Sequence, residues 1–448
     1  RTWYNFGHDL PDRNVVHAVA QDHANPDLLF AGTEFGAFAS LDGGAHWIEI
    51  AGMPTIQIRD LDIQERENDL IMASFGRGIF ILDDYTPMRH AREQQFEQPA
   101  HIYPVRRALR YVQISRFGPW DSGKGSQGQQ FYAAPNPPYG AMITYHLKDK
   151  LNTLRDERYE AERGDDWTYP TLEEFRAEDR EIAPTLLMVI HDEDGEVVRR
   201  FDVPNAPGLH RVAWDLKTTT TNPVIRTGDD RNPWNARGGG PLAPPGTYTA
   251  SLFTLEDGEY SRLTDGIAFE VESLDTATFE TDDYESLLAF QNRVMALGRA
   301  VRGAQRVAGD ARGRLSSLRT AIVETPEADP ALLADVHALR DRLDTMLIQL
   351  NGDPTSSRRQ VEQPPSISSR VGNVLNGLLN VTSAPTQMQR QNYQWAADAF
   401  EPLLADLRQL VEVDLVELEE RAEDAGVPYT PGRRIPDWGG PAAPSPEE

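Results

Sequence analysis

Short runs of apolar residues alternate with turn-forming residues over the first 90 positions of the chain. The runs begin at Val15 and recur at positions 28–33, 37–40 and 46–50. Asn, Asp, Gly and Pro stand between them, as in Asp42-Gly43-Gly44. Strands spaced by about 8–12 residues with turns of this kind are typical of antiparallel sandwiches and propellers. The pattern therefore predicts β structure for this part of the chain.

The same succession of apolar runs then repeats. Positions 58–63, 69–74 and 78–83 follow in the order of the first three runs, at an offset of about 43 residues. A four-stranded propeller blade has about this length, and such a period indicates a repeat architecture. We expect residues 1–92 to form the terminal blades of an incomplete β-propeller.

Residues 40–47 fit the Asp-box pattern Ser-x-Asp-x-Gly-x-Thr-Trp, with His46 where threonine is usual. In a hairpin of this kind the aspartate accepts hydrogen bonds from backbone N–H groups of its own turn, and glycine supplies a positive φ. The tryptophan is expected to cover the edge of the blade. The pattern thus predicts a structural role for Ser40, Asp42, Gly44 and Trp47, and it says nothing about catalysis.

Positions 25–33, the Asp-box and positions 73–84 together resemble the last blades of the sortilin-like, BNR-repeat "glycosyl hydrolase" propellers of bacteria. In that family a Gly-Arg-Gly-aromatic-x-Leu-Asp-Asp run closes the final blade. Phe75 stands where the family usually has histidine. The resemblance implies that the blade-closing motif is formed by Gly76, Arg77, Gly78 and Asp83.

The family resemblance also carries expectations about the whole protein. Its relatives are typically longer, with a secretion signal and many more blades. We therefore expect this chain to be the C-terminal part of a longer polypeptide that lacks most of its propeller here. The expected location is secreted, periplasmic or on the cell surface.

A second β domain is predicted for residues 131–275, after a connector at 93–130. Its sequence combines an Asp-Gly hairpin at 192–195, Gly-x-x-x-Val-x-Trp-Asp at 208–215 and Pro-Pro-Gly-Thr-Tyr at 244–248. This string resembles the Ig-like β-sandwich of flagellar hook-assembly and cell-surface proteins, with Trp214 in the core. A helical insertion is expected near 150–184, and the Gly- and Pro-rich loop at 222–240 is a candidate to reach the propeller.

Apolar residues at helical spacing dominate residues 280–425, separated by turns that contain Pro and Gly. Such stripes predict an antiparallel helical bundle. Pro402 is expected to kink or restart the last helix, and residues 426–448 are expected to form an irregular tail with Trp438 as an anchor. The predicted fold class is therefore multidomain, β plus α.

Composition narrows the possible partners. The chain carries 44 basic and 70 acidic residues, a net charge of -26, which argues against binding nucleic acid or anionic lipid. No apolar run approaches the ~20 residues that span a bilayer, and the lack of cysteine excludes disulfides and thiolate metal ligands. Only four of the basic residues are lysines, which fits either a GC-rich genome or adaptation to salt.

No strong catalytic or metal-binding pattern is present in the sequence. Arg59 and Arg77 lie in equivalent parts of the repeats, and they either point toward the propeller channel or pair with Asp60, Asp62 and Asp83. The acidic run at 192–195 suggests calcium, but the spacing of an EF-hand is missing, so a hairpin turn is preferred. Asn380-Val381-Thr382 matches the glycosylation pattern. No metal and no cofactor are predicted.

The function predicted from these features is binding of a peptide, protein or glycan, because propellers present loops around a channel and no catalytic set is found. Two alternatives stay open. One is a sialidase-like glycoside hydrolase whose active site lies in blades outside this chain, with the Tyr, Arg and carboxylate groups that such a site needs. The other is a scaffold of a surface or export complex.

Overall fold

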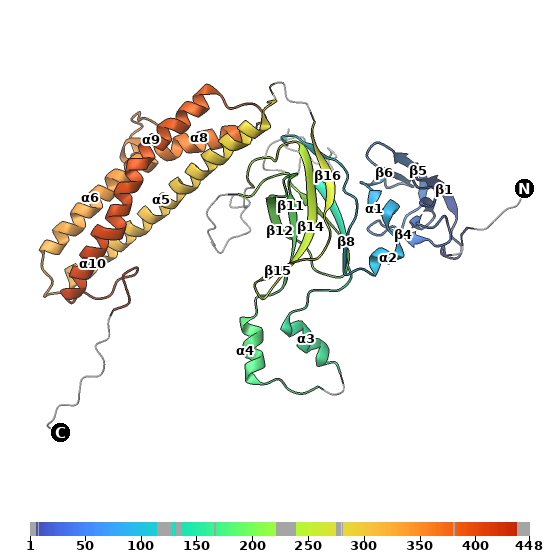
Figure 1. The fold of residues 1–448 in the computed structure, drawn as a ribbon, viewed down its shortest axis with the longest axis horizontal. Helices are drawn as coiled ribbons and strands as arrows, with labels where there is room; N and C mark the ends of the chain where they lie inside the picture. Colours follow the sequence, from blue (N-terminus) through green and yellow to red (C-terminus); the bar gives the residue numbers. More distant parts are fainter. Residues whose placement is uncertain are drawn as a thin grey trace, which may run out of the picture. The chain divides into compact units, whose positions relative to one another are not determined.

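A computed structural model describes residues 6–7, 9–113, 128, 130, 137–164, 167–220, 239–274, 279, 281–379 and 381–436. The chain divides into two compact units, residues 1–219 with 242–276 and residues 220–241 with 277–448. The first holds several mostly antiparallel sheets with short helices, and the second holds longer helices (Figure 1). Asn380, Trp438 and most of the 222–240 loop lie outside the described residues.

Two small antiparallel sheets begin the first unit. The first has the order β1 (Val16–Gln21), β2 (Leu29–Thr33), β3 (Gly36–Ser40) and β4 (Ile48–Glu49). The second has the order β5 (Ile58–Gln64), β6 (Asp69–Ser74) and β7 (Ile79–Leu82). Both lie where the alternating pattern and its repeat predicted strands.

The register of the two sheets shows which residues are equivalent. Across the first sheet Val19 pairs with Ala31 and Ala31 with Phe38. Across the second, the matching row is Leu61, Met72 and Phe80. The next row of the first sheet, on its other face, contains Ala20, Phe30 and Ala39, and its counterpart in the second contains Asp62, Ile71 and Ile81.

One face of the first sheet packs on the second sheet. Gly32 lies so close to β5 that a Cβ added to it would stand 2.9 Å from Ile58 Cγ2. Phe30 and Met72 are buried in the shared core. The outer face of the second sheet is not covered in this way: its Ile79 and Ile81 are 66% and 56% exposed.

Two further sheets share one hydrophobic core. A three-stranded sheet has the order β13 (Gly208–Trp214), β10 (Ala141–Leu147), β8 (Ala100–Ile102). A six-stranded sheet contains β12 (Val197–Asp202), β11 (Thr185–His191), β14 (Gly246–Glu256), β16 (Ile267–Ser273) and β9 (Ala108–Arg110), with β15 (Glu259–Arg262) paired to β14. As predicted, Trp214 lies in this core.

The acidic run at 192–195 forms a hairpin turn between β11 and β12. Asp192 Oδ1 accepts hydrogen bonds from the backbone N–H groups of Asp194 and Glu196, at 3.2 and 2.8 Å. Gly195 has a φ of +81°, which favours glycine. The side chain thus serves its own turn, as expected for the hairpin reading.

Helices interrupt the sheets in two places. Helices α1 (Thr86–His90) and α2 (Glu93–Phe96) follow β7. Helices α3 (Leu154–Ala161) and α4 (Leu172–Arg180) lie between β10 and β11, inside the insertion predicted from the sequence.

The second unit consists of helices around one core. They are α5 (Tyr284–Glu324), α6 (Ala331–Asn351), α7 (Pro354–Arg358), α8 (Ile367–Leu379), α9 (Gln387–Gln409) and α10 (Leu415–Asp424). The expected restart of the last helix at Pro402 is wrong, because α9 runs through it to Gln409. Phe400 and Leu403, on either side of the proline, are both buried in the core, and this packing favours a continuous helix. A π-helical turn at Leu410–Asp414 precedes α10 instead.

Two glycines of α5 offer a matched test of this packing. An added Cβ at Gly298 would stand 3.0 Å from Leu375 Cδ1, whereas Gly303 has open space around it. Gly303→Ala should raise the free energy of unfolding by about 1 kcal/mol through helix propensity. The free energy of unfolding of Gly298→Ala should be about 1–3 kcal/mol lower than that of Gly303→Ala. The added methyl group would crowd α8, which opposes the gain from helix propensity. Urea unfolding measures both, and equal stabilities would contradict the close approach of α5 and α8.

Candidate functional site

Turns and side chains gather at two opposite ends of the paired small sheets. One end carries the β1–β2 and β5–β6 turns together with α1, and we call it the locked end; its residues are Asp22, His23, Asn68, Tyr85 and Arg89. The other carries the β2–β3 and β6–β7 turns, and we call it the open end; its residues are His17, Phe35, Arg59, Phe75 and Arg77.

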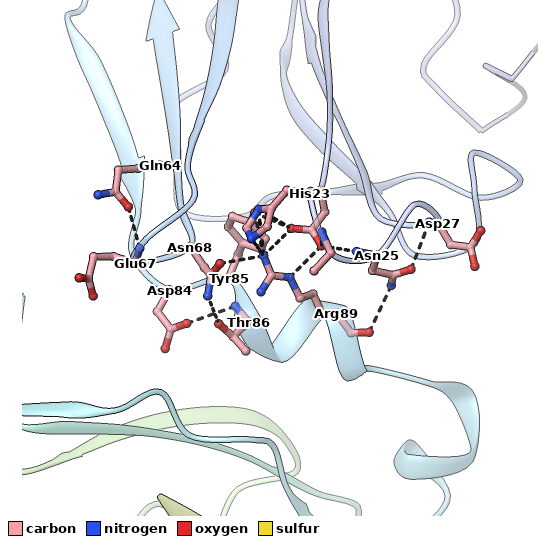
Figure 2. Close-up of polar contacts among 12 residues, drawn as sticks. His23, Asn25, Asp27, Gln64, Glu67, Asn68, Asp84, Tyr85, Thr86 and Arg89 are labelled. Carbon is pink, nitrogen blue, oxygen red and sulfur yellow. Dashed lines mark hydrogen bonds and ion pairs between the residues drawn. The ribbon is translucent and has the colours of Figure 1, made fainter. Parts of the chain in front are cut away.

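The carboxylate of Asp22 is the centre of the locked end. Its side chain is fully buried. Arg89 donates to it from Nε at 2.7 Å and from Nη2 at 2.6 Å, and the Tyr85 hydroxyl donates at 2.6 Å. Backbone N–H groups of Ala24 and Asn25 donate at 3.2 and 2.7 Å. Figure 2 shows Arg89 extending from α1 into this cluster.

Arg89 also connects the two sheets. Its Nη2 donates to Asn68 Oδ1 at 2.7 Å, and Asn68 belongs to the β5–β6 turn. Asn68 adopts a φ of +58°, and its amide donates to Thr86 Oγ1 at 3.0 Å. The β1–β2 turn, the β5–β6 turn and α1 are thereby fixed to one another through a single guanidinium (Figure 2).

The protonation states of the cluster follow from these contacts. Burial by itself would raise the pKa of Asp22, but hydrogen bonds from Arg89, Tyr85 and the Asn25 N–H, with the charge of Arg89, lower it to about 2. Burial, followed by the hydrogen bond to Asp22, raises the pKa of Tyr85 well above its ordinary value. The cluster therefore holds an ionised carboxylate, a neutral phenol and a guanidinium.

The locked end has the residue types of a sialidase-like site but not its chemistry. A nucleophilic tyrosine needs a base that takes its proton, and a general acid needs a raised pKa. Here both oxygens of Asp22 already accept hydrogen bonds from within the cluster, and the pKa of Tyr85 is moved away from activation. The contacts are those of a structural ion pair.

The predicted blade-closing motif leads into the junction with the following sheets. Arg211, on β13, donates from Nη1 and Nη2 to the backbone carbonyls of Asp83 and Asp84, each at 2.7 Å. Arg106 Nη1 lies 3.1 Å from Glu67 Oε2. Burial and then the nearby Asp69 raise the pKa of Asp83. Arg211 thus holds the backbone of the motif, and Arg106, between β8 and β9, holds the carboxylate of Glu67.

The Asp-box residues contact one another as a hairpin turn. Ser40 Oγ donates to Asp42 Oδ1 and accepts from the Gly44 N–H, both at 2.8 Å. Asp42 also accepts from the His46 N–H at 2.9 Å. Trp47 Nε1 donates to the backbone carbonyl of Phe6 at 2.6 Å. The bonds of Ser40 and Asp42 stay within the turn, whereas the bond of Trp47 reaches Phe6, 41 residues earlier in the chain.

The open end is built from two equivalent bulges. The pairing register shifts between positions 16 and 18 in β1 and between 58 and 60 in β5, so His17 and Arg59 are the extra residues of the two strands. Bulges re-aim a side chain and are frequent beside functional sites. The Nε2 atoms of Gln57 and His17 lie 2.8 Å apart, so the two bulges meet at the same end.

Each bulge has an exposed phenylalanine in the neighbouring turn. Phe35 follows β2 and is 42% exposed, and Phe75 follows β6 and is 69% exposed. Arg77 is next to Phe75 in the same turn, between Gly76 and Gly78, which both have positive φ. The repeat therefore places a phenylalanine and a cationic or imidazole group at the open end of both sheets.

The two arginines of the open end make no polar contact with the described part of the chain. Arg59 and Arg77 are exposed, and neither has a polar partner within the part of the chain that the structure describes. The pairing with Asp60, Asp62 or Asp83 considered from the sequence is not formed among those residues. In a chain of net charge -26, two free guanidinium groups are available to an anionic ligand.

Sequence reasoning identified only some of these residues. It singled out Arg59 and Arg77 as equivalent positions of the repeats, which is wrong, because both lie in the second sheet, Arg59 on β5 and Arg77 in the β6–β7 turn. It missed Asp22, Arg89 and His17. The repeat could have indicated His17, because His17 occupies the position of Arg59 at an offset of 42 residues.

Comparison with known proteins adds little. No family model matches the chain, and no curated protein matches it. Two solved structures from B. thetaiotaomicron align with 58% of this chain and 25% of their own length: the extracellular domain of a protein described as a hybrid two component system (10% identity, TM-score 0.14) and that of one described as a one component system (12%, 0.13). TM-scores this low assign neither a fold nor a function. None of the described helices is long and apolar enough to cross a membrane.

Replacing Arg89 with methionine should destabilise the first unit strongly. The substitution leaves Asp22 buried without its counter-charge, and breaking a buried pair in this way costs about 3–5 kcal/mol. Urea unfolding measures the loss, with hydrogen exchange in β1, β2 and α1 as the local probe. Arg66→Met is the control, because Arg66 pairs with Glu67 at the surface and should stay near wild type. Similar losses in the two variants would contradict a central role for Asp22.

The Asp22 contacts should also disappear at acid pH. The carboxyl has an ordinary pKa of 3.8 and a pKa of about 2 in the folded chain. It therefore stabilises the fold above pH 3.8, by about 2 kcal/mol, and this stabilisation is lost as the pH falls toward 2. The difference in unfolding free energy between wild type and Asp22→Asn should shrink over that interval. Pulse proteolysis with pepsin in urea measures it, and a constant difference would contradict the assignment.

Proposed function

We propose that this protein binds an anionic peptide or glycan at the open end, through Arg59 and Arg77 with the phenylalanines beside them. The observation that carries the proposal is the pair of exposed guanidinium groups without a polar partner, set beside exposed aromatic rings. Arginine binds carboxylates through two parallel hydrogen bonds. Aromatic faces supply apolar contact area at the same place.

The two small sheets are, in this proposal, blades of a sortilin-like β-propeller with BNR repeats. The strand-pairing register of the two small sheets supports this interpretation. The row of Phe30 and Ala39 is buried against the second sheet, whereas its counterpart in the second sheet contains Ile71 and the exposed Ile81. A further blade, seated on this outer face as the second blade seats on the first, would cover the exposed isoleucines. The Asp-box and Gly76, Gly78 and Asp83 of the blade-closing motif keep their proposed structural roles, and Arg77 of the same motif is assigned to the ligand.

The rest of the chain completes the proposed organisation. Residues 131–275 form an Ig-like sandwich with the insertion near 150–184, and residues 280–425 form a helical bundle. The protein is secreted, periplasmic or at the cell surface, as the family resemblance implies. A binding role is preferred to hydrolysis because the only described Tyr–Arg–Asp cluster in the two small sheets is saturated by its own contacts.

The function is tested with the whole chain on arrays of anionic and neutral peptides and glycans. We expect retention of anionic probes, and Arg59→Ala/Arg77→Ala should weaken it about tenfold or more, because two charge-assisted hydrogen-bond donors are lost. Arg319→Ala/Arg408→Ala is the matched control, since both arginines are exposed and the change in net charge is equal.

The following results would overturn this proposal. One is equal retention of neutral and anionic probes, or an equal effect of the two double variants. The other is release of product from chromogenic glycosides that the Arg59/Arg77 variant abolishes, which would favour the hydrolase. Recovery of the chain only within a larger surface complex, with no retained probe, would favour the scaffold.

A further inference from the structure

Helices α3 and α4 form a hairpin that has no buried core of its own. Neither helix contains a buried residue. Each is instead begun by a capping box, Thr153 with Asp156 and Thr171 with Glu174. Tyr169 and Leu172 are 73% and 66% exposed. Polar contacts and caps, rather than apolar burial, hold this hairpin together.

The pairing of the two helices depends on Arg158. Its Nε and Nη2 donate to Glu178 at 2.6 and 3.1 Å, and its Nη1 donates to Glu162. The guanidinium carbon lies 4.6 Å from the ring centre of Tyr159 and 5.2 Å from that of Phe175. The hydrogen bond from Arg158 lowers the pKa of Glu178. The hairpin thus already holds one arginine between aromatic rings and carboxylates.

A cavity of about 690 Å³ opens between the same helices. Its walls include Trp167 and Tyr169, whose rings meet edge to face with centres 5.8 Å apart. They also include the carboxylates of Glu157 and Glu174. Arg158 lies among aromatic rings and carboxylates, and the cavity contains a second group of rings and carboxylates of the same kinds.

This second set contains no cation. Arg158 is the only basic residue among the described residues that line the cavity, and it is bound to Glu178 and Glu162. The Glu157 side chain has no polar partner within the described chain, and only one oxygen of Glu174 is used, by the cap with Thr171. The charge of the cavity is therefore left uncompensated and negative.

We propose that the α3–α4 cavity binds an arginine or lysine side chain of a basic partner peptide. The cation lies over Trp167 and Tyr169 and is neutralised by Glu157 and Glu174. Aromatic rings with carboxylates select a cation over a neutral apolar side chain. This site is separate from the open end, and it takes a ligand of the opposite charge.

The proposal is tested by NMR of the whole chain labelled with ¹⁵N in its tryptophan indoles, with the Trp167 signal identified from Trp167→Phe. The probe is the peptide acetyl-Gly-Arg-Gly-amide, and its partner is the same peptide with citrulline, which keeps the shape of arginine without its charge. We expect a saturable shift of the Trp167 signal with the arginine peptide only. Trp395, 44% exposed on α9, is the internal control and should not shift.

Glu157→Gln and Glu160→Gln form the matched pair of variants. Both residues lie on α3 and both changes remove one negative charge, but only Glu157 lines the cavity. Glu157→Gln should weaken binding of the arginine peptide about fivefold, and Glu160→Gln should leave it unchanged. Equal weakening by the two variants would mean attraction by the net negative charge alone and would overturn the site.

Other occupants are separate outcomes that overturn the proposal. An equal shift with the citrulline peptide would show that the cavity does not distinguish a charged side chain from a neutral one. A shift with acetyl-Gly-Pro-Pro-Gly-amide but not with arginine would indicate a proline-binding groove, and a shift with tetramethylammonium alone would indicate a quaternary ammonium site.

Discussion

The buried carboxylate of Asp22 is the constraint on which the arrangement of the two small sheets depends. A charge that has no access to water needs a counter-charge and filled hydrogen-bond positions. Arg89 and Tyr85, together with two backbone N–H groups of the β1–β2 turn itself, meet that need. The carboxylate therefore fixes the β1–β2 turn to α1, and Arg89 extends the connection to the β5–β6 turn through its hydrogen bond to Asn68.

This constraint makes the two ends of the sheets unequal. The locked end uses its charged groups, Asp22 and Arg89, on each other. Next to it, Arg106 pairs with Glu67, and Arg211 donates to the backbone carbonyls of Asp83 and Asp84. The open end uses none of its arginines in this way. Residues that are already paired hold structure, whereas unpaired charged residues on bulges are available to a ligand. The division explains how one repeat supplies both a rigid junction and a candidate binding surface.

The sequence was sufficient for features that depend on neighbouring residues. Alternation located the strands, the repeat indicated equivalent positions, and the Asp-box anticipated the turn at Asp42. It was insufficient where partners are distant, since Asp22 and Arg89 are 67 residues apart and nothing local marks either one. The restart expected at Pro402 was wrong, because α9 continues through it with Phe400 and Leu403 buried in the core. The hairpin cavity escaped notice since a helix without buried residues leaves no apolar stripe to read.

Arginines in three settings show how the surroundings, rather than the residue type, determine the role. Arg89 is buried against Asp22 and holds the fold. Arg158 lies between two rings and two carboxylates and joins two helices. Arg59 stands on a bulge without a partner. Exposed arginines without a carboxylate partner also stand on the helices, as Arg319 and Arg408 do, so Arg59 is informative because of its place on a bulge. By the same logic an unpaired carboxylate is informative where it shares a cavity with aromatic rings, as Glu157 does with Trp167 and Tyr169.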